Sequence, residues 1–215
     1  MRAAAGVLVG LGIAFLGWYA YTMTDLVFSV APRLYVSASP PLAPGAPRIH
    51  IAMILPITSK GTQLRPHNVL RELVAAKVFW PAFLDTVEGA EGRFRYTVYY
   101  GVNATDAPLL DHAVWAEFES IMRPGTEAPG AAPIAWSKTV YSVQTLSQMY
   151  NALAARALRE GADYFYITND DTKMLTRGWS EAFVQQLERS PAGENIGTTG
   201  PQSYGECGWD CVGGH

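Results

Sequence analysis

The feature that most constrains the fold is an amphipathic helix pattern that leads directly into a short apolar strand pattern. Gly161 ends the helix pattern of Thr145–Glu160, in which apolar residues recur at intervals of three and four: Leu146, Met149, Tyr150, Leu153, Ala157 and Leu158. The apolar run Tyr164–Ile167 comes next, and it ends abruptly in Asn169-Asp170-Asp171. A helix that carries the chain back to the start of another strand is typical of parallel sheets.

Three further segments have the composition of buried strands. They are apolar or rich in aromatic and β-branched residues: Arg48–Thr58, Phe94–Asn103 and Ile134–Val143. Strands of a parallel sheet are covered on both faces, so their side chains should form the core. The predicted core residues are Ile51, Met53, Leu55, Val98, Tyr100, Phe165 and Ile167.

Helix patterns separate these strands. The first is Asn68–Phe79, with Asn68 as its N-cap and Pro81 as its stop, and Asp111 should cap a second helix from His112 to Met122. Arg123–Pro133, rich in proline and glycine, is predicted to be a loop. The alternation of strand and helix patterns along the chain predicts an α/β fold with a mostly parallel sheet and helices on both faces.

Composition excludes two classes of protein. The chain has 215 residues, is 49% hydrophobic and 16% charged, and has a net charge of −3, so it is neither disordered nor a basic nucleic-acid binder. Cys207 and Cys211 form no disulfide framework. They could pair with each other, share a metal with His215, or stay unpaired.

The N-terminal segment Ala3–Met23 has no charged residue, and aromatic residues cluster near its end. As a helix it would be roughly 31 Å long, about the thickness of the apolar core of a bilayer. This pattern predicts a transmembrane signal anchor over residues 1–24, with Arg2 left in the cytosol and the remaining chain in the secretory lumen. A cleavable signal peptide is the alternative, and it sends the domain to the same compartment.

The predicted organisation after the anchor has three parts. Residues 25–48 contain a proline-rich stretch that favours an extended, solvated stem. Residues 49–205 should form the globular domain, and residues 206–215 a tail.

The acidic triplet Asn169-Asp170-Asp171 comes after a strand, at the edge of the sheet where open α/β folds bind ligands. Carboxylate and amide oxygens suit Mg²⁺ or Mn²⁺, which would neutralise a diphosphate leaving group. The alternative is an Asx-type turn, with Asp171 preceding a turn at Thr172–Leu175.

Tyr150–Glu188 resembles the central segment of GT-A-fold glycosyltransferases. In that family, a helix with an asparagine and small residues leads into a strand that ends in a DxD motif, which binds the metal and the diphosphate of a nucleotide-sugar. The resemblance implies a Rossmann-like GT-A sheet. It also implies that Asn169, Asp170 and Asp171 bind Mn²⁺ or Mg²⁺, with Asp171 as the principal ligand and Asp170 on the ribose or the metal. Gly178-Trp179-Ser180-Glu181 with its subsequent helix, and Ile196–Pro201, resemble the segments downstream of the motif in eukaryotic and viral glycosyltransferase-like proteins.

The resemblance also implies nucleotide-sugar contacts nearer the N-terminus. They come from the loop Pro56–Ser59 after the first strand, with Pro56 and Thr58 as contacts, and from Asn103 and Asp106 after the second strand. For Asp106 the alternative is an ordinary surface turn. Asn103-Ala104-Thr105 is also an N-glycosylation sequon, and a glycan there would crowd the nucleotide.

These features lead to one expected function and one alternative. The expected protein is a membrane-anchored, single-pass type II glycosyltransferase of the Golgi or ER, which moves a sugar from a UDP- or GDP-sugar to a glycan or protein acceptor. No catalytic base is identified in the sequence. The alternative is a truncated, non-catalytic GT-A-like protein that binds a nucleotide or a partner. Phosphoryl transfer by the same acids is disfavoured, because the sequence has no P-loop.

Overall fold

The computed structural model describes residues 49–89, 92–143, 145–193 and 197–200. The chain divides into two compact units between Arg177 and Gly178. The predicted anchor, the stem and the residues Cys207, Cys211 and His215 lie outside the described residues. Within the described ranges, no helix has both the length and the apolar character needed to cross a membrane.

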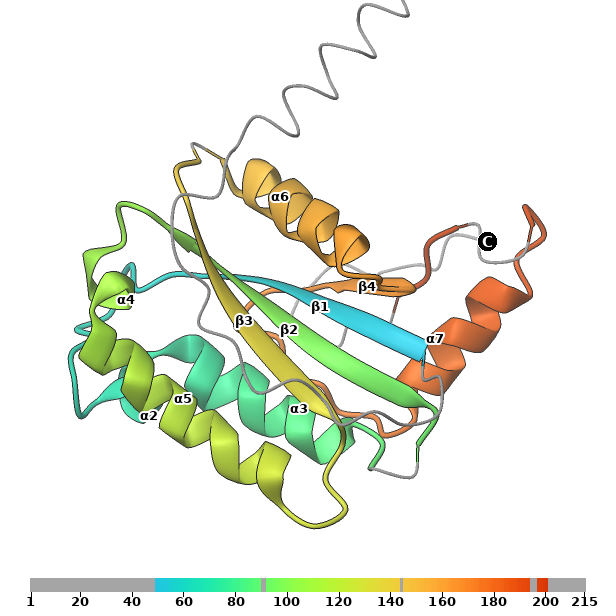
Figure 1. Ribbon diagram of the computed structural model, residues 1–215, viewed down its shortest axis with the longest axis horizontal. Coiled ribbons are helices and arrows are strands. Elements are labelled where there is room, and N and C mark those ends of the chain that lie inside the picture. Colours follow the sequence, from blue (N-terminus) through green and yellow to red (C-terminus); the bar gives the residue numbers. More distant parts are fainter. Residues whose placement is uncertain (1–48, 90–91, 144, 194–196, 201–215) are drawn as a thin grey trace, which may run out of the picture. The chain divides into compact units, whose positions relative to one another are not determined.

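The first unit is built on a sheet of four parallel strands in the order β3-β2-β1-β4 (Figure 1). The strands are β1 (Ile49–Ile57), β2 (Phe94–Asn103), β3 (Ile134–Tyr141) and β4 (Tyr164–Ile167). All four lie within segments predicted as strands, so the α/β class is confirmed. β1 pairs on one side with β2 and on the other with β4, which makes it a central strand.

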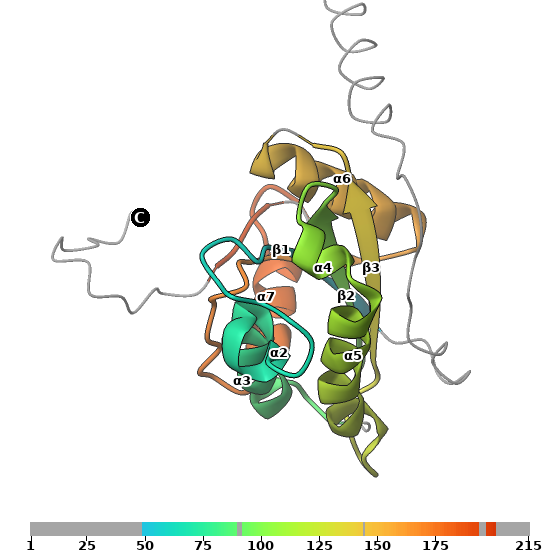
Figure 2. The ribbon, with the colours of Figure 1, turned by 90° about the vertical axis from the view of Figure 1, so that its left-hand side faces the viewer.

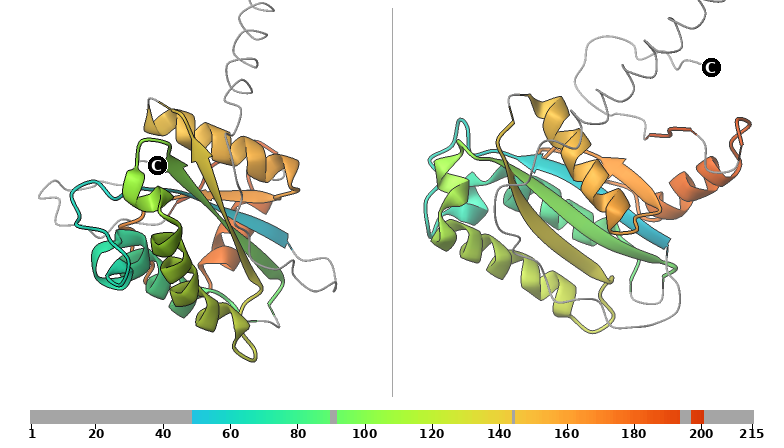
Figure 3. Two further views of the ribbon diagram at one scale, coloured as in Figure 1. Left: turned by 60° about the vertical axis from the view of Figure 1, so that its left-hand side comes forward. Right: turned by 45° about the horizontal axis from the view of Figure 1, so that its top comes forward.

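Helices cover both faces of this sheet (Figure 3). The crossovers from β1 to β2 and from β2 to β3 contain α2 (Val69–Glu72), η1 (Ala75–Phe79), α3 (Trp80–Thr86), α4 (Ala107–Leu110) and α5 (His112–Glu127). The crossover from β3 to β4 contains α6 (Leu146–Arg159). This last crossover runs back past β2 and β1, so a right-handed connection places α6 on the opposite face from α3 and α5.

The face under α6 is a compact apolar layer. Ala52, Ile54, Tyr99 and Tyr141 of the sheet pack with helix residues one and two turns apart: Met149, Ala152, Leu153 and Ala157. Gly101 permits close approach at this point, because a Cβ there would lie 2.7 Å from Met149 Sδ and 2.9 Å from Leu153 Cδ1.

The opposite face is largely aromatic. Tyr100 meets Phe118 with ring centroids 5.3 Å apart, and Phe83 meets Tyr96 at 5.6 Å in an edge-to-face arrangement. Trp80 and Trp136 form a third edge-to-face pair across the same layer. These large side chains attach α3 and α5 to the sheet.

The predicted start of α5 and both predicted ends of α6 are confirmed. The Asp111 side chain accepts a hydrogen bond from Ala113 N at 2.7 Å and begins α5. Thr145 begins α6 with a reciprocal capping box to Gln148. Gly161 has a φ of +78°, which suits the left-handed turn after α6.

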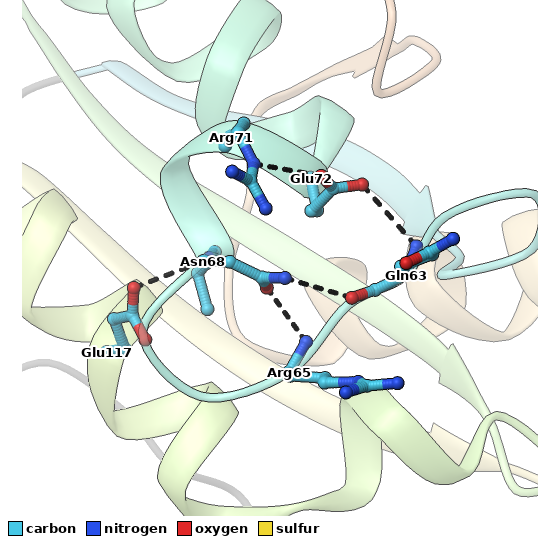
Figure 4. Close-up of polar contacts among 7 residues, drawn as sticks. Gln63, Arg65, Asn68, Arg71, Glu72 and Glu117 are labelled. Atoms are coloured by element: carbon cyan, nitrogen blue, oxygen red, sulfur yellow. Dashed lines mark hydrogen bonds and ion pairs between the residues drawn. The ribbon is translucent and has the colours of Figure 1, made fainter.

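The prediction that Asn68 caps the first helix through its side chain is wrong (Figure 4). Its side chain turns back along the chain, where Oδ1 accepts from Arg65 N and Nδ2 donates to the Gln63 carbonyl. Glu117 of α5 accepts instead from the first helical N–H, that of Val69, at 3.1 Å. The carboxylate of Glu117, which is distant in the sequence, therefore takes the place of the Asn68 amide as the acceptor at the start of α2.

Two predicted boundaries are also wrong. Pro81 does not stop a helix: η1 leads directly into α3, and Pro81 lies in the first turn of α3, where a missing N–H costs no hydrogen bond within that helix. α5 continues through Pro124 to Glu127, so the predicted loop begins later than expected. Gly125 lets this last turn approach Leu84, because a Cβ there would lie only 2.2 Å from Leu84 Cδ1.

The predicted core is correct for β1 and β2 and wrong for β4. Ile51, Met53, Leu55, Val98 and Tyr100 are buried, whereas Phe165 and Ile167 are 41% and 60% exposed. The register places Phe165 beside Ala52 and Ile167 beside Ile54, on the face of α6. Within the described residues, β4 is an edge strand, and α6 packs on β1 and β2 and leaves these two side chains open.

The second unit contains α7 (Trp179–Glu188), which confirms the helix expected after Gly178. Gly178 has a φ of +74° at the N-cap position. Trp179 and Phe183, one turn apart, meet edge to face with centroids 5.9 Å apart.

We predict that Phe165→Ala is much less destabilising than Phe118→Ala. The fully buried Phe118 ring contacts Tyr100 and Trp115, so its removal should cost about 3–5 kcal/mol of unfolding free energy, against about 1–2 kcal/mol for the half-exposed Phe165. Urea denaturation of the two variants measures the difference. Equal losses would show that β4 is covered in the folded protein.

His50 forms a buried polar link at the amino end of the sheet. Its Nδ1 lies 3.1 Å from the Gly161 carbonyl oxygen, and its Nε2 lies 2.8 Å from Thr97 Oγ1. A carbonyl only accepts, so Nδ1 carries the proton and Nε2 accepts from the Thr97 hydroxyl. Burial, followed by the charge of Arg95, lowers the pKa of His50 from its usual 6.5.

We predict that His50 makes the fold sensitive to mild acid. Because its pKa is lower in the folded state, the unfolded chain binds more protons below pH 6.5, and stability should fall as the pH drops from about 7.5 to about 5.5. In His50→Gln this part of the pH dependence should disappear, whereas the exposed His112→Gln should retain it. Thermal melts across this range test it; an identical slope in both variants would contradict the prediction.

Candidate functional site

The carboxyl ends of β1, β2 and β4 open onto one pocket of about 580 Å³. The pocket is lined by every residue that the sequence marked as a candidate ligand: Pro56, Thr58, Asn103, Asp106, Asn169, Asp170 and Asp171. α4 and the beginning of α6 flank the carboxyl end of β3 and supply the remaining wall (Figure 2).

The strand order explains why the pocket forms here. From β1 the connections proceed through β2 to β3, and the next strand returns to the other side of β1. The loop after β3 leads to α6 on one face of the sheet, whereas the loops after β1 and β2 lead to helices on the other face, which leaves a crevice beyond the carboxyl ends of the strands. The triplet after β4 and the loop after β1 meet in this crevice.

Asp106 is the most heavily bonded side chain in the pocket wall. Its Oδ2 accepts from Thr58 Oγ1 at 3.0 Å and from the backbone N–H of Ser59 at 2.8 Å. Its Oδ1 accepts from Ser59 Oγ at 2.5 Å and from Leu109 N at 3.4 Å. The N–H of Asp106 donates to the Asn103 carbonyl at 2.9 Å, so the turn alternative is correct for its backbone, but its side chain is buried and only 8% exposed, unlike that of an ordinary surface turn.

Asn103 also uses both ends of its side-chain amide within the protein. Nδ2 donates to the Val143 carbonyl at 2.9 Å, and Oδ1 accepts from the backbone N–H and the hydroxyl of Thr105. These bonds hold the chain after β2 against the chain after β3. The nitrogen to which the sequon would attach a glycan is thus the donor of this link.

The three residues of the acidic triplet differ in exposure: Asp170 is half-buried, and Asn169 and Asp171 are exposed. Burial is the main cause of a raised pKa at Asp170, and the adjacent Asp171 carboxylate raises that pKa further. The backbone of Thr58, in the loop after β1, opposes this shift by lowering the pKa of Asp170. Negative charge at Asp170 is therefore only partly compensated by the protein.

The turn alternative for the triplet is correct for its backbone. The N–H of Thr172 donates to the Asn169 carbonyl at 3.2 Å, which closes a tight turn. Asp171 caps no helix, since the next helix begins at Trp179 with Gly178 in the cap position. The carboxylates of Asp170 and Asp171 thus remain available to the pocket.

Tyr150 of α6 is a pocket residue that the sequence analysis assigned only to the apolar side of a helix. Its hydroxyl lies 2.6 Å from Asn169 Oδ1 and 3.3 Å from the Thr168 carbonyl. Burial, with the charges of Asp170 and Asp171, raises the pKa of Tyr150, so the hydroxyl keeps its proton and donates. Tyr150 therefore orients the first residue of the triplet.

Lys60 is a further pocket residue that the sequence did not predict, whereas Ser59 belongs to the loop that was expected to flank the nucleotide. Both come directly after the end of β1, which was the available signal for their position. Lys60 is exposed and brings an ammonium group to the rim. Among the lining residues described, three carboxylates face one lysine, so the pocket is acidic overall.

A divalent cation fits this chemistry at Asp170 and Asp171. Their oxygens are hard ligands, and the uncompensated charge at Asp170 is what a cation would neutralise. Within the part of the chain that the structure covers, no group of three or more His, Cys, Asp or Glu side chains converges as a complete metal site. A bound ion would thus need ligands beyond the two carboxylates, such as Asn169, water or phosphate oxygens.

Comparison of the chain with protein families, with curated proteins and with solved structures found no match in any of the three. A parallel α/β sheet serves many unrelated functions, so the fold alone assigns none. The chemistry of the pocket must therefore carry the functional argument.

We predict that Asp170→Asn stabilises the protein when metal ions are removed. The pKa of Asp170 is raised in the folded state, so its ionisation opposes folding as the pH rises above its ordinary 3.8 and through the raised pKa. In EDTA at about pH 7, the variant should melt above the parent, and the gain should vanish at about pH 3.

Asp111→Asn is the matched control, because Asn and Asp are similarly good N-caps and this site is away from the pocket. Its melting temperature should stay near that of the parent. A lower melting temperature for Asp170→Asn in EDTA would contradict the charge argument.

Proposed function

We propose that this chain is a metal-dependent glycosyltransferase that uses a UDP- or GDP-sugar as donor and a glycan or protein as acceptor. The observation that carries the proposal is the meeting, in one pocket, of the β1 loop with the acidic triplet after β4. The pocket volume of about 580 Å³ is in the range of small-ligand and cofactor sites. The parallel strand order and the position of the triplet support a GT-A-type sheet.

The distribution of polar and apolar residues supports a ligand with two different ends. The region near β4 and the β1 loop is polar, with Asp170, Asp171 and Lys60. The part of the lining from α4, the chain after β3 and the start of α6 is more apolar, with Pro108, Val143, Leu146 and Met149. In the proposal, the diphosphate lies on the polar side and the nucleoside lies against the more apolar wall.

Charge explains why the proposed ligand requires a cation. A diphosphate carries negative charge, and the two exposed or half-buried carboxylates of the triplet would repel it. Mn²⁺ or Mg²⁺ held by Asp170 and Asp171, with the oxygen of Asn169 shared with Tyr150, supplies the compensating charge. In the proposal, Lys60, which is exposed and also lines the pocket, contacts a phosphate oxygen.

The proposed location is the Golgi or ER membrane, with the domain in the lumen. The uncharged segment Ala3–Met23 supports a single-pass type II anchor, because its length suits a bilayer. The proline-rich stretch after it would keep the domain away from the membrane surface.

A second candidate is a protein that binds the nucleotide and transfers nothing. One observation favours it: the carboxylate of Asp106 is engaged by donors of the protein itself. In the proposal above, Asp170 and Asp171 are occupied by the cation. Among the pocket residues described, no further carboxylate and no histidine is present to act as a general base. Inverting transfer would need such a group from elsewhere.

We predict that Mn²⁺ strengthens nucleotide binding to the full-length chain by about tenfold or more, because the cation removes the repulsion between diphosphate and carboxylates. Calorimetry with UDP and with GDP, each with and without Mn²⁺, measures this coupling. Asp171→Asn should abolish most of it.

Asp111→Asn, outside the pocket, should leave the coupling unchanged. If neither nucleotide binds more tightly with Mn²⁺, the metal-dependent function is wrong. Release of UDP or GDP from the corresponding sugar nucleotides then separates the two candidates, since binding without any transfer selects the non-catalytic protein.

A further inference from the structure

Asp106 lies in the pocket wall, yet its hydrogen bonds face the protein. Each carboxylate oxygen accepts from two donors: Oδ2 from Thr58 Oγ1 and Ser59 N, and Oδ1 from Ser59 Oγ and Leu109 N. A carboxylate offers about four acceptor positions, so these donors occupy all of them. A ligand hydroxyl or base N–H would have to displace one of these bonds.

These bonds also join two loops that are far apart in the sequence. Asp106 lies after β2, whereas Thr58 and Ser59 lie after β1. Thr58 lines the same pocket as Asp170, which lies after β4. The side chain of Asp106 therefore holds the loop that shares the pocket with the triplet.

The helix α4, which Asp106 caps, is itself held in place by another side chain. Asp106 caps α4, and the carbonyl of Leu109 in that helix accepts from Lys138 Nζ at 2.7 Å. Lys138 is buried, and its ammonium group lies 4.5 Å from the centre of the Trp115 ring. A charged group held this firmly resists movement of α4, and hence of Asp106.

We propose that Asp106 is a positioning residue, which holds Thr58 and Ser59 in place in the pocket that they share with Asp170, and that it does not itself bind the nucleotide. The geometry of the cation site then depends on a side chain from a different strand. The expected effect of Asp106 on metal affinity rests on the proposed function, whereas its expected effect on the order of the β1 loop is independent of that function.

Asp106→Asn and Ser59→Ala test this proposal, with Asp111→Asn as control. Asp111 is also an aspartate N-cap, at the neighbouring helix, but its side chain bonds to Ala113 of its own helix and not to the β1 loop. In Asp106→Asn the Ser59 N–H faces an amide in place of a carboxylate, so the backbone N–H groups of Thr58 and Ser59 should exchange with solvent about tenfold faster. Hydrogen exchange followed by NMR on the full-length chain measures both.

The same variants are titrated with Mn²⁺ alone and with uridine alone. Asp106→Asn should weaken Mn²⁺ binding about tenfold and leave uridine binding unchanged, and Ser59→Ala should weaken Mn²⁺ binding less. The double variant should be no weaker than Asp106→Asn by itself, because both changes act on one contact network. Asp111→Asn should match the parent in every measurement.

Two results would overturn the proposal. Unchanged exchange of Thr58 and Ser59 in Asp106→Asn would show that Asp106 does not hold the loop. Weaker uridine binding with unchanged Mn²⁺ binding would make Asp106 a ligand contact. If the parent binds no Mn²⁺, the proposed function fails, and faster exchange in Asp106→Asn but not in Asp111→Asn still supports the positioning role.

Discussion

The pairing of β1 with both β2 and β4 is the constraint on which the rest of the first unit depends. It places β1 at the centre of the sheet, so both of its faces must be covered, and it carries buried residues from His50 to Ile57. It also forces the loops after three strands to emerge at one edge. The pocket, the contact between Asp106 and the β1 loop, and the place of Thr58 and Asp170 in one pocket lining all result from this arrangement.

The carboxylates of the pocket divide into two kinds by their partners. Asp106 is buried but surrounded by donors, so the fold supports its charge. Asp170 lies beside another carboxylate, and burial with that neighbour raises its pKa. Only the second kind leaves charge for an external cation to neutralise, which is why residue type alone is a poor guide to the roles of these aspartates.

The sequence predicted the strands and α6 well because their signals are local. Thr145 and Gln148 lie three residues apart, and the apolar runs of β1 and β2 are long and uninterrupted. Asn68 and Pro124 misled because distant contacts override local preference: Glu117 satisfies the start of α2, and the last turn of α5 packs near Leu84. Pro81 misled because proline is tolerated in the first turn of a helix as well as after its end. The exposure of Phe165 could not be foreseen, since an apolar strand looks the same at the centre and at the edge of a sheet.

The sequence by itself determined the α/β class, the four strands and the acidic triplet at a strand end, because periodicity, caps and composition act over a few residues. Only the tertiary structure decided which strands are neighbours, and therefore that Thr58, Asp106 and Asp170 lie in one place. It also decided that Tyr150 faces the triplet and that Asp106 is engaged on both oxygens. The physical reason is that a side chain's partners depend on strand order and register, which join residues that the sequence keeps far apart.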